Sequence, residues 1–238
     1  MRRARCSIMW LVFFAFLLLW LPSLGESYLL SPSYILKRLV WAYSPLRSIT
    51  VDQRVEAYGE DTTYPFDSID EKVVMEPIVP VKIWVQGKAV TGESDIDPQL
   101  DINPYLIRVQ HWYGFYKDVF LNHQVNLVMS LLGRLGVSPV ETRLRLLYPD
   151  IAYQVGNELT EENIRGLWVD KERFIPLRLA GTLIGKRDGK PFQELIDIRY
   201  GDYRLLNERF WYPFDIQIFV NGKLSLRIRA SSVSLTTY

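Results

Sequence analysis

Apolar and polar positions change their period along the chain, and the first change lies near residue 45. Ser31-Pro32 is typical of a helix start, with a serine cap and a proline in the first turn. Apolar residues then recur every four positions, as on one face of a helix: Ile35, Leu39 and Tyr43. Pro45 predicts the end of this helix. From Thr50 to Tyr58 apolar and charged residues alternate, which predicts a half-buried antiparallel strand.

Residues 59–70 are polar and rich in turn-forming residues. Two short strands are predicted after them, at Lys72–Met75 and Val81–Val85. Pro77 and Pro80 restrict these strands to a sheet edge or a bend, because proline cannot donate to the ladder. Gln86-Gly87-Lys88 predicts a hairpin turn, and residues 92–104 predict a loop.

A second helical pattern occupies the middle of the chain. Its apolar positions are spaced by three and four residues: Leu121, Val125, Val128, Leu132 and Leu135. Gly133 and Gly136 mark its end, and its start is expected between Tyr105 and Asn122. The pattern predicts one helical region that buries one face.

From Glu141 to the C-terminus the chain has only strand patterns. The predicted strands are Leu144–Leu147, Ile151–Val155, Gly166–Asp170, Phe174–Gly181, Glu194–Tyr200, Tyr203–Leu206, Phe214–Val220 and Leu224–Ala230. No βαβ rhythm and no repeat of fixed period occurs. The fold class predicted is α+β: about nine to eleven antiparallel strands in one curved sheet, a half-barrel whose concave face is covered by helices.

The last two predicted strands also suggest their own register. A three-residue loop, Asn221-Gly222-Lys223, keeps one face of the pair apolar, whereas a two-residue loop would set Ile218 opposite Ser225. The predicted pairs are Ile216 with Ile228, Ile218 with Leu226, and Val220 with Leu224.

The first 25 residues have the three parts of a secretory signal peptide. The basic head consists of Arg2, Arg3 and Arg5. An uncharged, mostly apolar run follows from Ile8 to Leu21, and small residues before Glu26 form a cleavage motif that ends at Gly25. As a helix the run covers roughly 21 Å, less than the roughly 30 Å hydrocarbon core of a membrane. We therefore expect residues 1–25 to be removed and residues 26–238 to form a single exported domain; an uncleaved anchor is the alternative.

The composition excludes several classes of protein. Lys and Arg number 28 against 27 Asp and Glu, so no basic excess points to a nucleic-acid partner. The single cysteine, Cys6, lies in the leader, so the exported domain has neither a disulfide nor a cysteine-based zinc site.

Candidates for catalysis are few. His111 and His123 are too far apart for a helical ligand pair, and the chain has no His-Glu-x-x-His and no Gly-x-Ser-x-Gly. The stretch Gly185–Lys190 is only superficially like a phosphate loop, because three residues separate its glycines and Pro191 replaces the required Ser or Thr. We expect no catalytic residue, no metal and no cofactor.

The apolar residues predict another kind of site. A half-barrel that helices cover loosely encloses an apolar cavity, which suits a lipid. The candidates for its lining are Leu121, Val125, Val128, Leu132, Trp84, Trp168, Ile216 and Ile218. The alternative is a fully packed core, where aromatic residues of strands usually lie.

The segment from Gly166 to Leu179 reads Gly-Leu-Trp-Val-Asp-Lys-Glu-Arg-Phe-Ile-Pro-Leu-Arg-Leu. It resembles the Leu-Trp-x-Asp-Lys-(Asp/Glu)-x-Phe-x-Pro-x-Arg-Leu hairpin of periplasmic proteins in the outer-membrane lipoprotein-sorting (LolA-like) superfamily. Residues 151–156 look like the strand before this hairpin, and Tyr203 with Trp211-Tyr212-Pro213 is similar to its Asp-Tyr-Arg … Tyr-Pro stretch. The opening pattern from Ile35 to Gln53 is similar to the first helix and strand of the group, so the resemblance extends over most of residues 34–230.

The resemblance implies a helical lid over an apolar cavity, which in the best-known members carries the acyl chains of lipoproteins across the periplasm. Those carriers have an arginine before a proline in an early strand, where it helps to latch the lid; this chain has Glu76-Pro77 there. We predict a periplasmic, non-enzymatic, monomeric protein that binds acyl chains of lipoproteins or lipids and takes part in their transport to the outer membrane. The alternatives are an envelope sensor on the same fold, with membrane-protein partners, and a structural envelope protein with a packed core.

Overall fold

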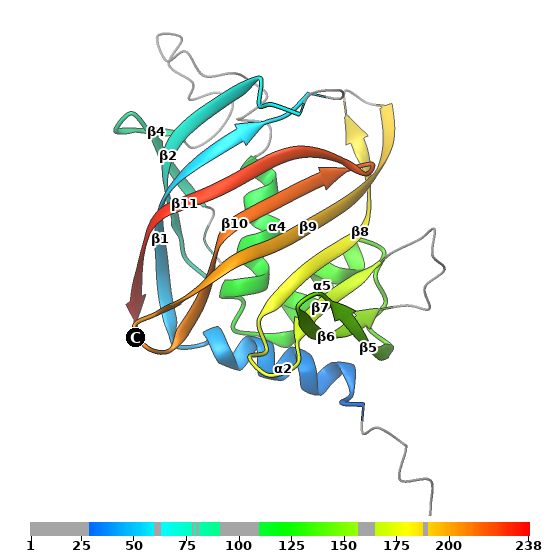
Figure 1. Cartoon of the computed structure of the whole chain (residues 1–238). Helices are drawn as coiled ribbons and strands as arrows, with labels where there is room; N and C mark the ends of the chain where they lie inside the picture. Colours follow the sequence, from blue (N-terminus) through cyan, green and yellow to red (C-terminus); the bar gives the residue numbers. More distant parts are fainter. Residues whose placement is uncertain are drawn as a thin grey trace, which may run out of the picture. The chain divides into compact units, whose positions relative to one another are not determined.

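In the described part of the chain, eleven antiparallel strands form one curved sheet, and three helices lie along its inner side (Figure 1). The computed structural model describes residues 29–59, 63–77, 79, 81–90, 110–156, 165–187 and 190–238. The elements below belong to the compact unit Ser31–Tyr238. The predicted leader, residues 1–25, and the predicted loop at 92–104 lie outside the described residues.

The sheet is an open half-barrel, as predicted. Its strands are β1 (Leu46–Ala57), β2 (Asp67–Met75), β3 (Lys82–Val85), β4 (Lys88–Val90), β5 (Glu141–Leu147), β6 (Asp150–Gly156), β7 (Gly166–Asp170), β8 (Pro176–Arg187), β9 (Lys190–Leu206), β10 (Phe210–Val220) and β11 (Lys223–Thr237). The spatial order is β4-β3-β2-β1-β11-β10-β9-β8-β7-β6-β5. The first and last strands of the unit therefore pair in the middle of the sheet, and within the described residues β4 and β5 are its two edges.

Helix α2 (Pro32–Tyr43) begins and ends where its sequence pattern predicts. The Oγ atom of Ser31 accepts a hydrogen bond from the backbone N–H of Tyr34 at 3.3 Å, which satisfies one of the free donors of the first turn. The buried residues of the helix are Ile35, Leu36, Leu39, Val40 and Tyr43. They include all three positions of the predicted apolar face.

The second helical region is two helices rather than the single one predicted. Helix α4 spans Gln110–Leu121 and helix α5 spans Val125–Arg134, with a break at residues 122–124. The break has side-chain partners: Asn122 Nδ2 donates to the Asp118 carbonyl at 2.6 Å, and the ring of His123 lies 3.1 Å from the Leu46 carbonyl. These contacts hold the turn of the chain between the two helices, and the apolar face of each helix is buried.

The terminal hairpin has the predicted pairs Ile216–Ile228 and Ile218–Leu226, but its loop prediction is wrong. Val220 pairs with Lys223, so the loop is the two-residue turn Asn221-Gly222, with φ of 51° and 81°. Positive φ at both positions is typical of the turn that matches the twist of a hairpin. A register shift beyond Ile218 then restores the apolar pairing, because a bulge absorbs one extra residue.

The two strands predicted at Glu194–Tyr200 and Tyr203–Leu206 are one long strand, β9. Asp202 has a φ of 48°, yet pairing with β10 continues on both sides of it, from Tyr200–Ile216 to Tyr203–Pro213. The chain therefore bends at this point and stays in the sheet. At its other end, pairing of β8 with β9 reaches Arg187–Lys190, so the described residues of the stretch that superficially resembles a phosphate loop belong to two paired strands.

The turn of the Gly166–Leu179 hairpin is organised by one carboxylate. Asp170 Oδ1 accepts the backbone N–H groups of Glu172 and Arg173 at 2.9 and 2.6 Å, while its Oδ2 accepts the Arg173 guanidinium at 2.7 Å. The same guanidinium bonds Asp150 at 2.7 Å and thereby ties the turn to the start of β6. These bonds explain why the motif has an aspartate directly before its turn.

Candidate functional site: the inner face of the sheet and its helices

The face of the sheet that is turned toward the helices, here called the inner face, is apolar across its width. Alternate residues of neighbouring strands point to it and are buried, among them Val51, Val55, Ile198, Ile216, Ile218, Leu226 and Ile228. Because facing residues of paired strands share one side of a sheet, the register alone makes this surface continuous.

Side chains from all three helices are buried in the same layer. Those of α4 are Val119, Phe120 and Leu121, and those of α5 are Val128, Leu131 and Leu132, each at most 1% exposed. The helices also contact one another, α2 with both α4 and α5. In the structure the inner face is therefore filled by helix side chains.

A glycine on the inner face lets the end of α5 touch the sheet. The backbone N–H of Thr182 in β8 donates to the carbonyl of Leu135, directly after α5, at 2.8 Å. A Cβ added to the neighbouring Gly181 would lie 2.6 Å from the Cβ of Leu135, closer than side chains approach. The small residue is what allows this end of the helix to be fixed on the sheet.

Phe120 of α4 lies at the centre of an aromatic cluster on this face. Its ring centroid lies 5.2 Å from that of Tyr43, 5.5 Å from Tyr200 and 5.7 Å from Tyr212. The Tyr43 hydroxyl donates to the Trp211 carbonyl at 2.9 Å. Burial raises the pKa of both Tyr43 and Tyr200 well above the ordinary value of a phenol, so both stay protonated.

The hydroxyl of Tyr200 is a polar group inside an apolar layer. It is buried and has no hydrogen-bond partner among the described residues. A buried hydroxyl without a partner costs about 1–3 kcal/mol, so such groups are uncommon unless something else binds them. Sequence reasoning missed this residue, although Tyr200 is in phase with Ile196 and Ile198 of its strand and so belongs to the same face.

The α4–α5 pair has a polar connection to the rest of the molecule at Lys117. Its Nζ donates to the carbonyl of Val79, in the loop between β2 and β3, at 2.7 Å. Burial lowers the pKa of Lys117, and burial likewise raises the pKa of Asp118 despite the nearby cations Lys117 and Arg134. Arg134 of α5 bonds Asp118 of α4 at 3.2 Å, which joins the two helices.

The structure brings together most of the sequence-predicted lining residues. Leu121, Val128, Leu132, Ile216 and Ile218 are buried between the helices and the inner face, and Val125 is half-buried at the start of α5. Trp84 and Trp168 lie on the opposite face, because each alternates with inward neighbours: Trp84 with Ile83 and Val85, Trp168 with Leu167 and Val169. The ring of Trp168 is covered by the Arg178 guanidinium, 4.9 Å from its centroid.

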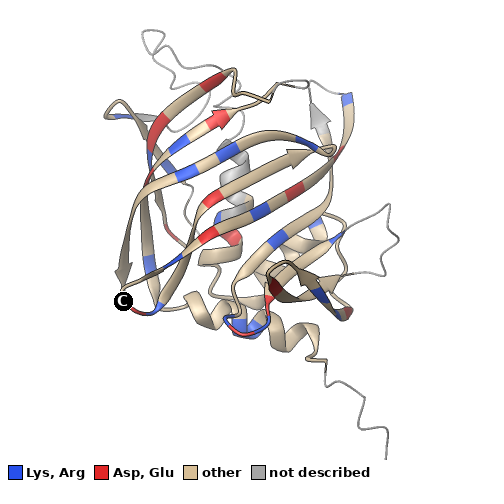
Figure 2. Ribbon diagram, viewed as in Figure 1, with Lys and Arg blue, Asp and Glu red and all other residues tan. Residues whose placement is uncertain are grey.

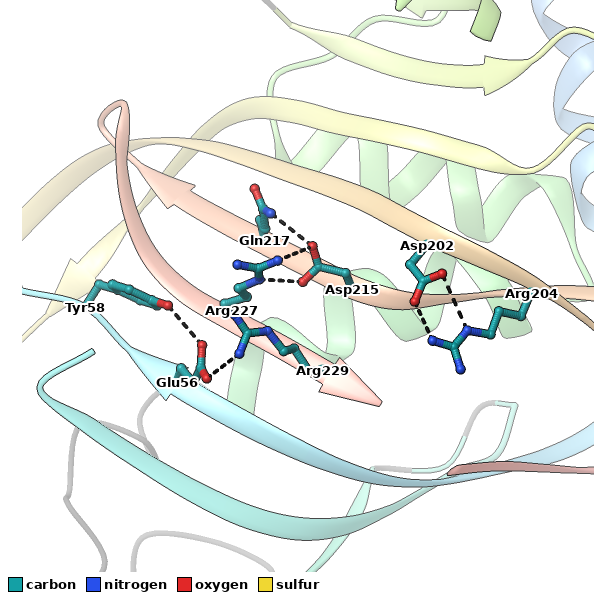
Figure 3. Close-up of polar contacts among 8 residues, drawn as sticks. All are labelled: Glu56, Tyr58, Asp202, Arg204, Asp215, Gln217, Arg227 and Arg229. Carbon is teal, nitrogen blue, oxygen red and sulfur yellow. Dashed lines mark hydrogen bonds and ion pairs between the residues drawn. The ribbon is translucent and has the colours of Figure 1, made fainter. Parts of the chain in front are cut away.

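The outer face of the sheet is polar, and its charges are largely paired with one another. Figure 2 shows Lys, Arg, Asp and Glu interleaved along β9, β10 and β11. Glu56 Oε1 accepts from Arg229 at 2.7 Å, and Asp215 binds the Arg227 guanidinium through both oxygens at 2.6 and 3.0 Å (Figure 3). Such pairs contribute little stability each.

A hollow of about 980 Å³ lies over strands β1, β2, β3 and β11, mainly on the outer side. Its polar lining includes Asp52, Arg54, Asp70, Lys72, Gln86 and Arg229, and Trp84 is its aromatic member. Glu76, which follows β2, pairs with Lys82 of β3 at 3.6 Å and so joins these two strands at the position where the resemblance implies an arginine.

Two further findings concern the described residues alone. They contain no group of three or more His, Cys, Asp or Glu side chains placed to hold a metal ion. None of their helices is both long and apolar enough to cross a membrane.

Comparison with known proteins gives the fold a name. No protein-family model and no curated protein matches the sequence. Among solved structures, a LolA superfamily protein from Nitrosomonas europaea is similar with a TM-score of 0.50 at 10% identity, over 88% of this chain and 95% of its own. A domain assigned to outer membrane lipoprotein sorting, from Vibrio parahaemolyticus, has a TM-score of 0.47 at 7% identity, over 86% and 92%. The resemblance predicted from the sequence is thus confirmed at the level of the fold: this chain has the LolA-like half-barrel.

Proposed function

We propose that this protein binds acyl chains of lipoproteins or lipids at the inner face of its half-barrel and takes part in their transport through the periplasm to the outer membrane. Helices α4 and α5 form the lid of this site. The fold supports the proposal, since the half-barrel with helices on one side is that of the LolA superfamily. The division between the faces supports it too, because buried apolar residues make up the inner face, whereas the ion pairs Glu56–Arg229 and Asp215–Arg227 lie on the outer face.

The observation that carries the proposal is the unpartnered hydroxyl of Tyr200. It lies beneath Phe120 of the lid, and no residue described here accepts or donates a hydrogen bond to it. An acyl chain that entered this layer would bring its ester or amide carbonyl, and the hydroxyl could donate to that oxygen. Ligand binding would then remove the free-energy cost of the unpaired Tyr200 hydroxyl, which supports a position for the ligand carbonyl next to this residue.

An acyl chain must displace the lid, because helix side chains fill the inner face in the structure. The exchange is energetically feasible. Burial of a CH₂ group contributes about 0.8 kcal/mol, so a chain of roughly 16 carbons gains up to about 12 kcal/mol. Burial of the same chain in a membrane contributes nearly the same free energy. A carrier therefore needs to bind the acyl chain only about as strongly as a membrane does in order to take it up and release it.

Hydrogen exchange with and without an acylated peptide tests this function. A lid that opens should exchange with a low local free energy, and the amides of residues 110–134 should become more protected when the acylated peptide binds. Amides of the β10–β11 hairpin should be protected throughout and serve as the internal control. The same peptide without its acyl chain should change nothing. Full protection of both helices from the start, with no response to the acylated peptide, would support the packed structural protein instead.

A further inference from the structure

Helix α2 and the β5–β6 hairpin lie at the same end of the unit (Figure 1). We define the Trp41 surface there by six residues, all exposed except the half-buried Arg38 and listed here: Lys37, Arg38, Trp41, Leu146, Tyr148 and Ile151. The four apolar members are 63%, 70%, 91% and 49% exposed, in chain order. Large apolar residues that are exposed side by side mark interaction sites more often than isolated ones do.

The strand part of this surface belongs to the inner side of the sheet. Leu146 of the edge strand β5 pairs with Ile151 of β6, so the two side chains share one face. Tyr153, two residues further along β6, points to the same side and stacks on Phe174 with centroids 6.2 Å apart. The helices do not extend over Leu146 and Ile151, which is why both are exposed.

Arg38 joins the strand part to helix α2. Its guanidinium lies 4.9 Å from the ring centroid of Phe174 and 5.3 Å from that of Trp41, so it is held by an aromatic ring from each element. The surface is therefore continuous from α2, through the turn after β7, to the edge of the sheet. The cation–π contacts fix the guanidinium in place without neutralising it.

Within the described part of the chain, this arginine has no anionic partner. The structure gives Arg38 no ion pair with any described residue, and its Nε is buried without a hydrogen bond. Helix α2 has no acidic residue, and the exposed Lys37 is adjacent. Asp150 and Asp170, the nearest acids of the turns beside it, are bound to Arg173; Glu172 is exposed next to Lys171. The helix thus presents two cations beside exposed tryptophan, tyrosine and aliphatic side chains.

We propose that the Trp41 surface binds to anionic phospholipid membranes. Tryptophan and tyrosine favour the headgroup level of a bilayer, where an apolar ring and a polar edge both find partners. Lys37 and Arg38 bind lipid phosphates, and Leu146 with Ile151 enters the acyl boundary. A second copy of the chain fits less well, because a two-fold contact through α2 would bring these cations together. The proposal goes beyond cargo binding and does not depend on it.

The test is cosedimentation of the protein, purified from a periplasmic extract without cargo, with vesicles of two compositions. We expect binding to vesicles that contain one quarter phosphatidylglycerol, a blue shift of tryptophan emission, weaker binding in 0.5 M salt, and little binding to pure phosphatidylcholine. Lys37→Glu and Leu146→Ser should each weaken binding at least tenfold. The matched controls are Lys190→Glu and Ile184→Ser, two exposed positions near the β8–β9 tip, and these should bind as the parent does.

Several outcomes would overturn the proposal. Equal binding of all four variants would exclude this surface, and equal binding to both vesicle types would exclude the role of the cations. An absence of vesicle binding, combined with a dimer that Leu146→Ser dissociates, would assign the surface to a second copy. If the protein does not bind vesicles but the acylated peptide still protects α4 and α5, only this proposal fails. If the protein binds vesicles but the acylated peptide protects neither helix, only the carrier function fails.

Discussion

The Nζ of Lys117 and the carbonyl oxygen of Val79 are 2.7 Å apart, and this bond joins helix α4 to the loop between β2 and β3. The resemblance predicted from the sequence implies a latch between the helices and an early strand, and it places Glu76-Pro77 at that position. The structure has a cation of α4 bonded to the backbone three residues after Glu76.

Replacement of Lys117 by methionine should loosen helix α4 and leave the sheet intact. A hydrogen bond to a charged group contributes about 1.5–3 kcal/mol, and about 1.4 kcal/mol corresponds to a tenfold change in an equilibrium. We therefore expect amides of α4 to exchange about tenfold faster, with unchanged exchange in β9 and β10. Lys82→Met is the control, since that exposed lysine pairs with Glu76 and not with a described residue of α4. Equal rates of amide exchange in α4 of the parent and of Lys117→Met would show that the contact does not stabilise this helix.

Two glycines near the end of α5 should respond to alanine in opposite directions. Gly181→Ala places its Cβ against Leu135 and should destabilise the fold by about 1–3 kcal/mol through overpacking. Gly133 is exposed within α5 and an added Cβ has no atom within 4 Å, so Gly133→Ala should stabilise by about 0.5–1 kcal/mol. Urea unfolding measures both changes. A shift of the same sign for the two variants would contradict the docking of α5 on β8.

Two of the three tyrosines around Phe120, Tyr43 and Tyr200, should differ when each loses its hydroxyl. Tyr43→Phe breaks the bond to the Trp211 carbonyl and should destabilise by about 1 kcal/mol. Tyr200→Phe removes a hydroxyl that has no partner, so stability should stay the same or rise by up to about 1 kcal/mol. If the hydroxyl binds a ligand carbonyl, Tyr200→Phe should also weaken the affinity for an acylated peptide several-fold. Lower stability together with unchanged affinity would show that the hydroxyl serves the fold.

The contribution of Asp170 to stability should depend on pH. Burial raises the pKa of this carboxyl, but the hydrogen bonds from Arg173 and from the backbone of Arg173 and Glu172 outweigh burial and hold the pKa below its usual value. A carboxylate with a lowered folded-state pKa stabilises the fold above its unfolded pKa of about 3.8, and this stability is lost as pH falls through the folded-state value.

Asp170→Asn should therefore be less stable than the parent by about 1–3 kcal/mol at pH 7, and the gap should shrink below pH 4. Denaturant unfolding across this range measures the gap. Glu172→Gln, an exposed acid of the same turn, should show a small difference at every pH. A gap for Asp170→Asn that is constant from pH 7 to pH 3 would show that its charge is unimportant.

Local patterns in the sequence were sufficient for those parts of the fold that depend on neighbours in the chain. Ser31 and Pro32 predicted the start of α2, and alternation predicted most strands and the shared face of Ile216 and Ile218. The motif from Gly166 to Leu179 predicted the fold through its resemblance to a known hairpin. The motif can be recognised from the sequence because its turn is built almost entirely from its own residues. Periodicity reports which residues of one element lie together, and such facts need no other part of the chain.

The tertiary structure decided the rest, because it depends on which distant elements become neighbours. Alternation alone places Trp84 and Trp168 out of phase with their apolar neighbours, but only the strand order shows that this side is turned away from the helices. The bulge in β11 and the break between α4 and α5 are likewise absent from the local sequence pattern, because contacts with other parts of the fold determine them. The surroundings of Tyr200 and Lys117 also come from distant parts of the chain. The Tyr200 hydroxyl is buried there without a hydrogen bond, whereas Lys117 bonds to Val79, and no local pattern in the sequence predicts either environment.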